Sequence, residues 1–204
     1  MSLGYPLLVE PELHRGPLYR YLEKSSFADT WMRGGQIPIL PASAYLSAER
    51  KGILTPDEVT QAAYVGVSRA EIDAHFALNG QVVLINSVLG DRRVSWGHAI
   101  HQEQDALIMC FSSEKSADLM HRLGKGVCVE IPDIHYLKRC LDAQVGAESF
   151  FGRVHYATGD NRAHFLKHKD DDWQQEVRLV WLVADPRPTT VSLPLAIGRR
   201  VPNI

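Results

Sequence analysis

The stretch KHKDDDWQQEVRLVWLV, residues 167–183, decides the fold, because in it a charged turn runs directly into a strand pattern. From Gln174 onward apolar and polar residues alternate, which is the period of a β-strand with one face toward a core. Glu176 and Arg178 therefore point the same way, opposite to Val177 and Leu179. The two charged residues form either a structural ion pair or the working end of a polar binding site.

The composition predicts one globular domain with a sizeable core. The 204 residues are 45% hydrophobic and 23% charged, and the formal net charge of -2 argues against a broad surface for duplex nucleic acid. No apolar run approaches about 18 residues and the start lacks a signal-peptide pattern, so we expect a cytoplasmic protein without a membrane partner. Cys110, Cys128 and Cys140 are widely spaced, which indicates buried thiols rather than a disulfide or zinc framework.

Periodicity and capping signals predict an α+β fold that follows an N-terminal arm over residues 1–17. Strands are predicted at residues 18–22, 36–40, 81–89, 105–111, 126–131, 150–156, 174–183 and 189–195. Helices are predicted at residues 27–33, 55–64, 68–78, 112–123, 133–141 and 161–167. These elements lack the regular spacing of strand–helix–strand units, which excludes a doubly wound sheet.

The residues between these elements suggest two further kinds of site. Residues 90–97 are predicted as an exposed loop in which Arg92, Arg93 and Trp96 either engage a nucleic-acid base or form a solvated turn. A hydrolase or nuclease would use the histidines, chiefly His98, His101, His155 and His164. The H-x-x-H-x-E spacing that ends at Glu103 does not predict a metal site, because no helix is expected there.

Three stretches, in order, resemble a bacterial family of domains of unknown function akin to AbiGi-type abortive-infection proteins. They are Leu18-Tyr-Arg-Tyr21 before Ile37-Pro-Ile-Leu-Pro41, Cys110-Phe-Ser-Ser113 before Lys125-Gly-Val-Cys-Val-Glu130, and Val154-His-Tyr156 before residues 167–178. The family closes on K-x-x-x-W-x-x-E-x-E-x-R. Here Trp173-Gln-Gln-Glu-Val-Arg178 is two residues shorter and carries one glutamate instead of two.

The order of elements is also similar to the ADP-ribosyltransferase fold, which implies a mixed or antiparallel split β-sheet core with short flanking helices. By that resemblance Glu176 would be catalytic and would stabilise the oxocarbenium-like state formed as the N-glycosidic bond of NAD breaks. The residues that would bind NAD are Arg20, Ser43, Tyr45 and Arg178. Gln174 stands where arginine-specific transferases carry a second glutamate, which implies an acceptor other than arginine, either a nucleic acid or a protein.

The predicted function is therefore that of an NAD-dependent ADP-ribosyltransferase-like protein, a toxin or phage-defence effector. The alternative is a non-catalytic module of the same fold that binds a nucleotide or a partner protein. In that alternative Glu176 and Arg178 are a structural pair only.

Overall fold

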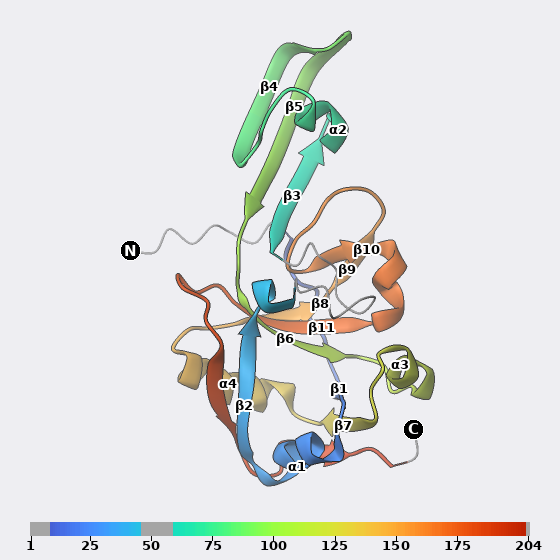
Figure 1. The fold of residues 1–204 in the computed structure, drawn as a ribbon, viewed down its shortest axis with the longest axis vertical. Helices are drawn as coiled ribbons and strands as arrows, with labels where there is room; N and C mark the ends of the chain where they lie inside the picture. The colour runs from blue at the N-terminus through green and yellow to red at the C-terminus, as the bar shows by residue number, and fades with distance from the viewer. Residues whose placement is uncertain (1–8, 46–58, 203–204) are drawn as a thin grey trace.

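The structure is a computed structural model, and it describes residues 9–45 and 59–202. A sheet of eight strands that branches at β6 (Leu107–Ser112) forms the body of the protein (Figure 1). One edge of β6 pairs along its whole length with β11 (Glu176–Trp181), and β11 pairs in turn with β8 (Phe150–Arg153). The other edge is divided between β2 (Gly35–Pro41) at its beginning and β1 (Leu18–Leu22) at its end. The fold is thus α+β with an antiparallel sheet that divides at β6.

Each branch of the sheet is completed by further antiparallel strands. β12 (Thr189–Leu193) pairs with β2, β7 (Val127–Ile131) pairs with β1, and β13 (Arg199–Arg200) pairs with β7. Beside this sheet β9 (His155–Ala157) and β10 (Leu166–His168) form a short parallel pair. The helices of the body are α1 (Ser25–Arg33), α3 (Ala117–Arg122) and α4 (Ile134–Val145), with 3₁₀ segments at Ala42–Tyr45 and Lys169–Gln174.

Strand β11 lies at the centre of the body, and all six of its residues are buried. Its alternation is as the sequence predicts: Val177, Leu179 and Trp181 join the main hydrophobic core, whereas Val180 joins a smaller cluster on the other face. The indole nitrogen of Trp181 donates a hydrogen bond of 2.8 Å to Asp142 of α4, which satisfies the one polar group that this face of the strand brings inside.

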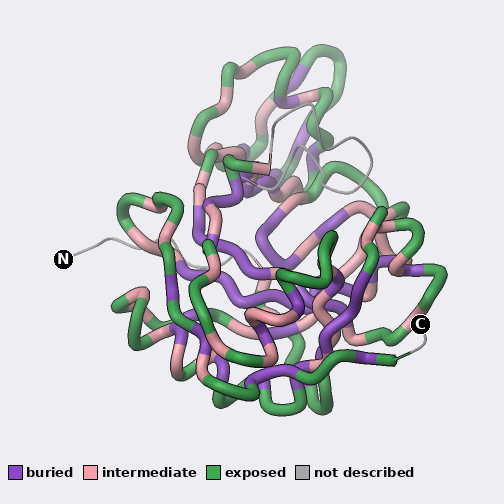
Figure 2. Tube along the Cα trace, turned by 60° about the horizontal axis from the view of Figure 1, so that its bottom comes forward, coloured by how far each residue is buried: buried purple, intermediate pink, exposed green. Residues whose placement is uncertain are grey.

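A second sheet, of three strands, projects from the body (Figure 1). It consists of β3 (Thr60–Val65), β4 (Gly80–Leu89) and β5 (Arg92–Glu103) in the order β3-β5-β4, and α2 (Arg69–Asp73) covers one of its faces. We call this unit the projecting sheet. Figure 2 shows buried segments running through the centre of the body, whereas exposed and intermediate segments make up most of the outer end of the projecting sheet.

Three predictions of secondary structure are wrong. Residues 60–64, predicted as part of a helix from 55, belong to β3, and residues 55–58 lie outside the described residues. The predicted loop 90–97 is the turn and first half of a hairpin strand, β5. The predicted helix at 161–167 is irregular until β10 begins. Strand pairing overrides the local signal in the first two cases, since β3 pairs with β5 and residues 92–97 pair with the adjoining strand β4. In the third, backbone hydrogen bonds join Arg162 to Ala62, and β10 pairs with β9.

Other predictions hold with shifted ends. The capping box of α2 is present at Ser68 and Glu71, but the helix ends at Asp73 instead of residue 78. Helix α3 begins five residues late, after its cap at Ser116, and α1 has no serine cap. The N-terminal segment is not a free arm from residue 9 onward, because the amide of Arg153 donates to the carbonyl of Glu12 at 2.8 Å.

Two further observations on the described residues concern the cysteines and the character of the helices. None of the three cysteines, which all lie in the described residues, forms a disulfide; Cys128 is buried, and Cys110 and Cys140 are half-buried. Burial raises the pKa of the Cys128 thiol to about 12. Among the described residues, no helix combines the length and the apolar character needed to cross a bilayer.

We expect Gly66→Ala to lower the free energy of unfolding by about 1–3 kcal/mol, because the residue adopts a left-handed backbone. Gly66 has a φ of +71°, and a Cβ there would lie 2.5 Å from the carbonyl oxygen of Trp96. Gly80→Ala is the matched control for backbone strain alone, since Gly80 also has a positive φ, +137°, but no atom near its missing Cβ, and this variant should lose less stability. Urea unfolding of both variants checks this; an equal loss in the two would show that the contact with β5 is unimportant.

Candidate functional site

Glu176, the predicted catalytic residue, lies at the start of β11 in a buried cluster of polar side chains. Arg178 donates from Nε to one carboxylate oxygen of Glu176 and from Nη2 to the other, both at 3.0 Å. Lys167, which β10 contributes, donates from Nζ to Glu176 at 3.2 Å and to the side-chain oxygen of Gln174 at 2.9 Å. The exposed fractions of Lys167, Glu176 and Arg178 are 3%, 7% and 0%, so one carboxylate and two cations lie almost out of contact with water.

Neighbouring groups fix the orientation of this cluster. The remaining nitrogen of the Arg178 guanidinium, Nη1, donates to the carbonyl of His164 at 2.7 Å. The hydroxyl of Tyr156 accepts a hydrogen bond from the backbone amide of Glu176 at 2.9 Å. The side-chain amide of Gln174 donates to Asp171 at 3.2 Å. A buried polar network in which each member has partners makes a rigid, specific arrangement.

The electrostatics of the cluster keep Glu176 ionised. Burial alone would raise the pKa of its carboxyl, but the charges of Arg178 and Lys167 outweigh this effect. Hydrogen bonds from Arg178 and from the Cys110 thiol act in the same direction, so the pKa of Glu176 lies well below its ordinary range. Burial, together with the Glu176 charge, raises the pKa of the Tyr156 hydroxyl well above its usual value, so this phenol is neutral at pH 7.

The chemistry open to this cluster follows from its geometry. Both carboxylate oxygens of Glu176 accept hydrogen bonds from cations, and the side chain is buried. A substrate hydroxyl at the carboxylate would compete with donors already in place, which come from Arg178, Lys167 and the Cys110 thiol. The arrangement described here therefore holds β10 and β11 together and neutralises an internal charge, as a structural ion pair does.

Arg20 is not brought to Glu176. Tyr19 and Glu176 both pair with Ser112, on the two edges of β6, and residues paired in this way have side chains on the same face of a sheet. Arg20, the neighbour of Tyr19, faces the other way. Its guanidinium lies 5.8 Å from the centre of the Phe111 ring and donates a hydrogen bond to the carbonyl of Cys110.

Ser43 and Tyr45 lie at the other end of β6. The amide and hydroxyl of Ser43 donate to the carboxylate of Asp105 at 3.0 and 2.5 Å, just before β6 begins, and Tyr45 is in the same 3₁₀ segment. Glu176 pairs with the last residue of β6, so the length of the strand, roughly 17 Å at about 3.3 Å per residue, separates the two positions. The structure thus brings Glu176 and Arg178 together but leaves Arg20, Ser43 and Tyr45 apart from them.

Two hollows in the described surface also lie away from these residues. One, of about 430 Å³, is lined by β7, Met120 and the segment 200–202. The other, of about 510 Å³, is lined by α4 and the residues that follow it. Neither is built on the predicted catalytic or NAD-binding side chains.

The sequence analysis missed an apolar surface on the projecting sheet. The face opposite α2 carries large side chains that are 49–67% exposed: Val65, Val83, Ile85, Val88 and Trp96. Strand pairing places most of them side by side, since His98 lies between Val65 and Val83, and Trp96 lies opposite Ile85. We call this surface the open face. The signal in the sequence was the apolar run at residues 81–89, which does not reveal that one side lacks a covering layer.

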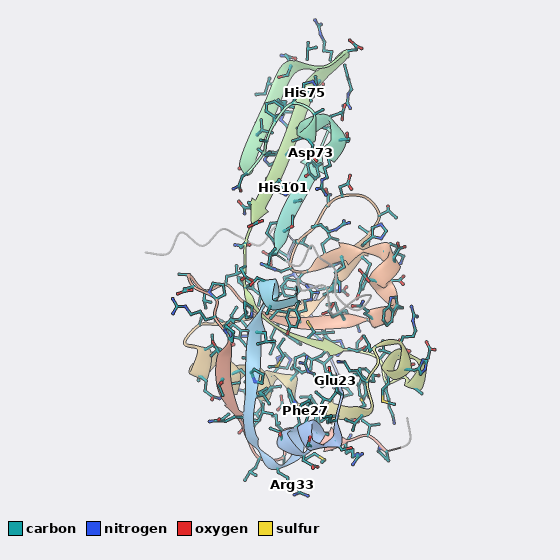
Figure 3. All side chains as sticks on the ribbon, in the orientation of Figure 1. Glu23, Phe27, Arg33, Asp73, His75 and His101 are labelled. Atoms are coloured by element: carbon teal, nitrogen blue, oxygen red, sulfur yellow. The ribbon has the colours of Figure 1, made fainter. Side chains whose placement is uncertain are left out.

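The predicted base-binding residues do not form one surface. Arg92 bonds to Glu71 at 2.5 Å and to the carbonyl of Gly66 at 2.6 Å, on the side of α2, whereas Trp96 belongs to the open face. His98 and His101 are an odd number of residues apart on β5 and therefore face opposite ways. Figure 3 shows His101 on β5, with Asp73 and His75 further out on the projecting sheet. Within the described ranges, no three potential metal ligands gather.

Comparisons of this chain with protein-family models, with curated proteins and with solved structures found no match. The family resemblance therefore stays a prediction, and the chemistry of the site has to be argued from the residues themselves.

We expect Glu176→Gln to lower the free energy of unfolding by about 3–5 kcal/mol, because two buried cations lose their carboxylate. The matched control is Asp73→Asn, which breaks an ion pair with Arg69 at 3.2 Å whose side chains are about half exposed. That change should stay within about 1 kcal/mol. Chemical denaturation measures both. Equal losses in the two variants would show that the buried cluster is not a stabilising network.

The lowered pKa of Glu176 also predicts that the effect of Glu176→Gln on stability depends on pH. A carboxyl whose folded pKa is depressed stabilises the protein above its unfolded pKa, ordinarily 4.5, and that stabilisation is lost as the pH falls below this value. The difference in unfolding free energy between wild type and Glu176→Gln should therefore be largest near neutral pH and shrink as the solution is acidified. Denaturation at a series of pH values tests this, and a constant difference would contradict it.

Proposed function

We propose that this protein is a protein-binding module and that the open face of the projecting sheet is its contact surface. The observation that carries the proposal is the set of large apolar side chains left in solvent on that face. An antiparallel sheet with one solvated face ordinarily alternates apolar residues inside with polar residues outside. Here the face under α2 is apolar and buried, and the opposite face is apolar and exposed.

The size of the effect supports a binding role. Fully burying an aliphatic or aromatic side chain contributes about 1.5–3 kcal/mol, so burying the exposed half of each contributes on the order of 1 kcal/mol. Five such side chains offset a substantial part of the free energy that two proteins lose on association. Trp96, which is 52% exposed, is the natural anchor, because tryptophan most often dominates binding energy at interfaces.

The buried charged cluster supports the same proposal, because its geometry suits a structural role. Its carboxylate is buried and already bonded to two cations, which suits a framework role in the body. The surface available for recognition is then the projecting sheet, which stands away from that body (Figure 1).

We expect Trp96→Asp to weaken partner binding at least about tenfold, because it removes an anchor worth roughly 1.4 kcal/mol or more and adds a charge. The control is Phe27→Asp, at a side chain that is 47% exposed on α1, at the far end of the molecule in Figure 3. Tagged wild type and both variants are produced in the native cell, and the proteins that co-purify with each are compared. A partner is a protein that co-purifies with wild type and Phe27→Asp but not with Trp96→Asp. The affinity of that partner for all three forms is then measured with purified components. Binding that both variants retain would overturn the proposal.

A second candidate function is the NAD-dependent ADP-ribosyltransferase activity implied by the resemblance. The observation in its favour is that Glu176 and Arg178, two residues of the closing motif, lie in contact, with Lys167 beside them. Strongly shifted pKa values of this kind are more frequent at functional sites than elsewhere. For NAD to use Glu176, a cation would have to leave the carboxylate.

The transferase proposal is tested with labelled NAD. Wild type and Glu176→Gln are incubated with NAD and, separately, with a protein extract, RNA and single-stranded DNA, after circular dichroism has shown both to be folded. Release of nicotinamide or transfer of label by wild type alone would support the activity and name the acceptor class. No consumption of NAD by either protein would remove this candidate and leave the binding module.

A further inference from the structure

The two outer edges of the projecting sheet differ in how their backbone groups are satisfied. At β3, the amide of Ala62 donates to the carbonyl of Arg162 at 2.7 Å, the amide of Arg162 donates back at 2.8 Å, and the amide of Tyr64 donates to the side chain of Asn161 at 3.0 Å. A loop of the body therefore caps that edge. At β4, pairing is with β5 alone in the part of the chain that the structure describes.

The free edge of β4 lacks the features that ordinarily prevent edge pairing. Natural edge strands are kept apart by short length, by charged side chains, by proline or by bulges. β4 is ten residues long, and its sequence GQVVLINSVL contains neither a charged residue nor a proline. Its backbone is irregular at Gly80, with a φ of +137°, and at Asn86, with a φ of +45°, which limits the regular part of the edge to residues 81–85.

We infer that the β4 edge pairs antiparallel with the β4 edge of a second copy of this chain, an inference that rests on the proposed binding role of the open face. When two identical strands pair about a twofold axis, a charged residue near the axis of one copy lies close to the same residue of the other copy. Such like charges would repel each other. An uncharged strand avoids that repulsion. The second copy is therefore the occupant that the composition of the edge fits.

One register also continues the open face across both copies. When Val83 lies opposite its own copy, Ile85 lies opposite Gln81, and residues of the same parity share a face. The two projecting sheets then become one sheet of six strands, in the order β3-β5-β4-β4-β5-β3. The exposed side chains Val83 and Ile85 of both copies gather about the axis, with Trp96 beside Ile85 in each. A contact along a single strand edge is a small interface, and small interfaces form reversibly.

The test is the mass of the full chain in solution as a function of concentration. Sedimentation of the wild type over about 1–100 µM, the range expected for a small interface, should show the mass doubling from 22.9 kDa. Val83→Lys places two ammonium groups opposite each other and should keep the chain monomeric. The matched control is Val65→Lys, because Val65 is also 49% exposed on the open face but belongs to the capped edge, and this variant should still dimerise.

Amide hydrogen exchange gives a second readout. The backbone amides of residues 80–85 should gain protection as the concentration rises in the wild type and in Val65→Lys, but not in Val83→Lys. Circular dichroism and denaturation first establish that both lysine variants fold as the wild type does.

The outcomes separate this inference from the function on which it rests. A wild type that stays monomeric throughout, or a Val65→Lys variant that loses the dimer as fully as Val83→Lys, overturns pairing along β4. If the chain does not dimerise but a different protein co-purifies with wild type and not with Trp96→Asp, the proposed binding role is retained with that protein as the partner. If the wild type dimerises along β4 while no binding depends on Trp96, the open face is not the contact surface.

Discussion

The two hydrogen bonds between Arg178 and Glu176 are the interaction on which the rest of the body depends. β11 lies between β6 and β8 with all its residues buried, so a carboxylate and a guanidinium on it have no access to water. The pair neutralises both charges within one strand. Lys167 and the carbonyl of His164 complete the network, which ties the segment that contains β10 to the central sheet. Removing the Glu176 carboxylate would leave two buried cations without it.

The sequence predicted those features that local patterns determine. The alternation around Glu176 and Arg178 placed the two side chains on one face, and the structure confirms that face. No role was predicted for Lys167, which the fold brings from β10 into contact with Glu176. Helix α4 begins within one residue of the start predicted at 133, with the Asp133 side chain accepting from the amide of Tyr136 at 2.8 Å.

The features that the sequence could not predict depend on pairing between distant segments. Whether Arg20 meets Glu176 is decided by the register of β1 and β11 against β6, and this register sets the two side chains on opposite faces. Residues 60–64 carry a helix signal upstream but become a strand because β5 lies beside them. The exposure of Val83 and Ile85 is decided by α2 covering one face of the projecting sheet and no element of the described chain covering the other.

The projecting sheet also has a small hydrophobic core of its own, formed by residues such as Ile72, Leu84 and Val94. It joins the body by the chain that continues from β5 toward β6 and by the hydrogen bonds between Ala62 and Arg162. A unit with few apolar contacts to its neighbour opens with a smaller free energy than the whole protein. We therefore expect the projecting sheet to open at a smaller free energy than the ion-paired body.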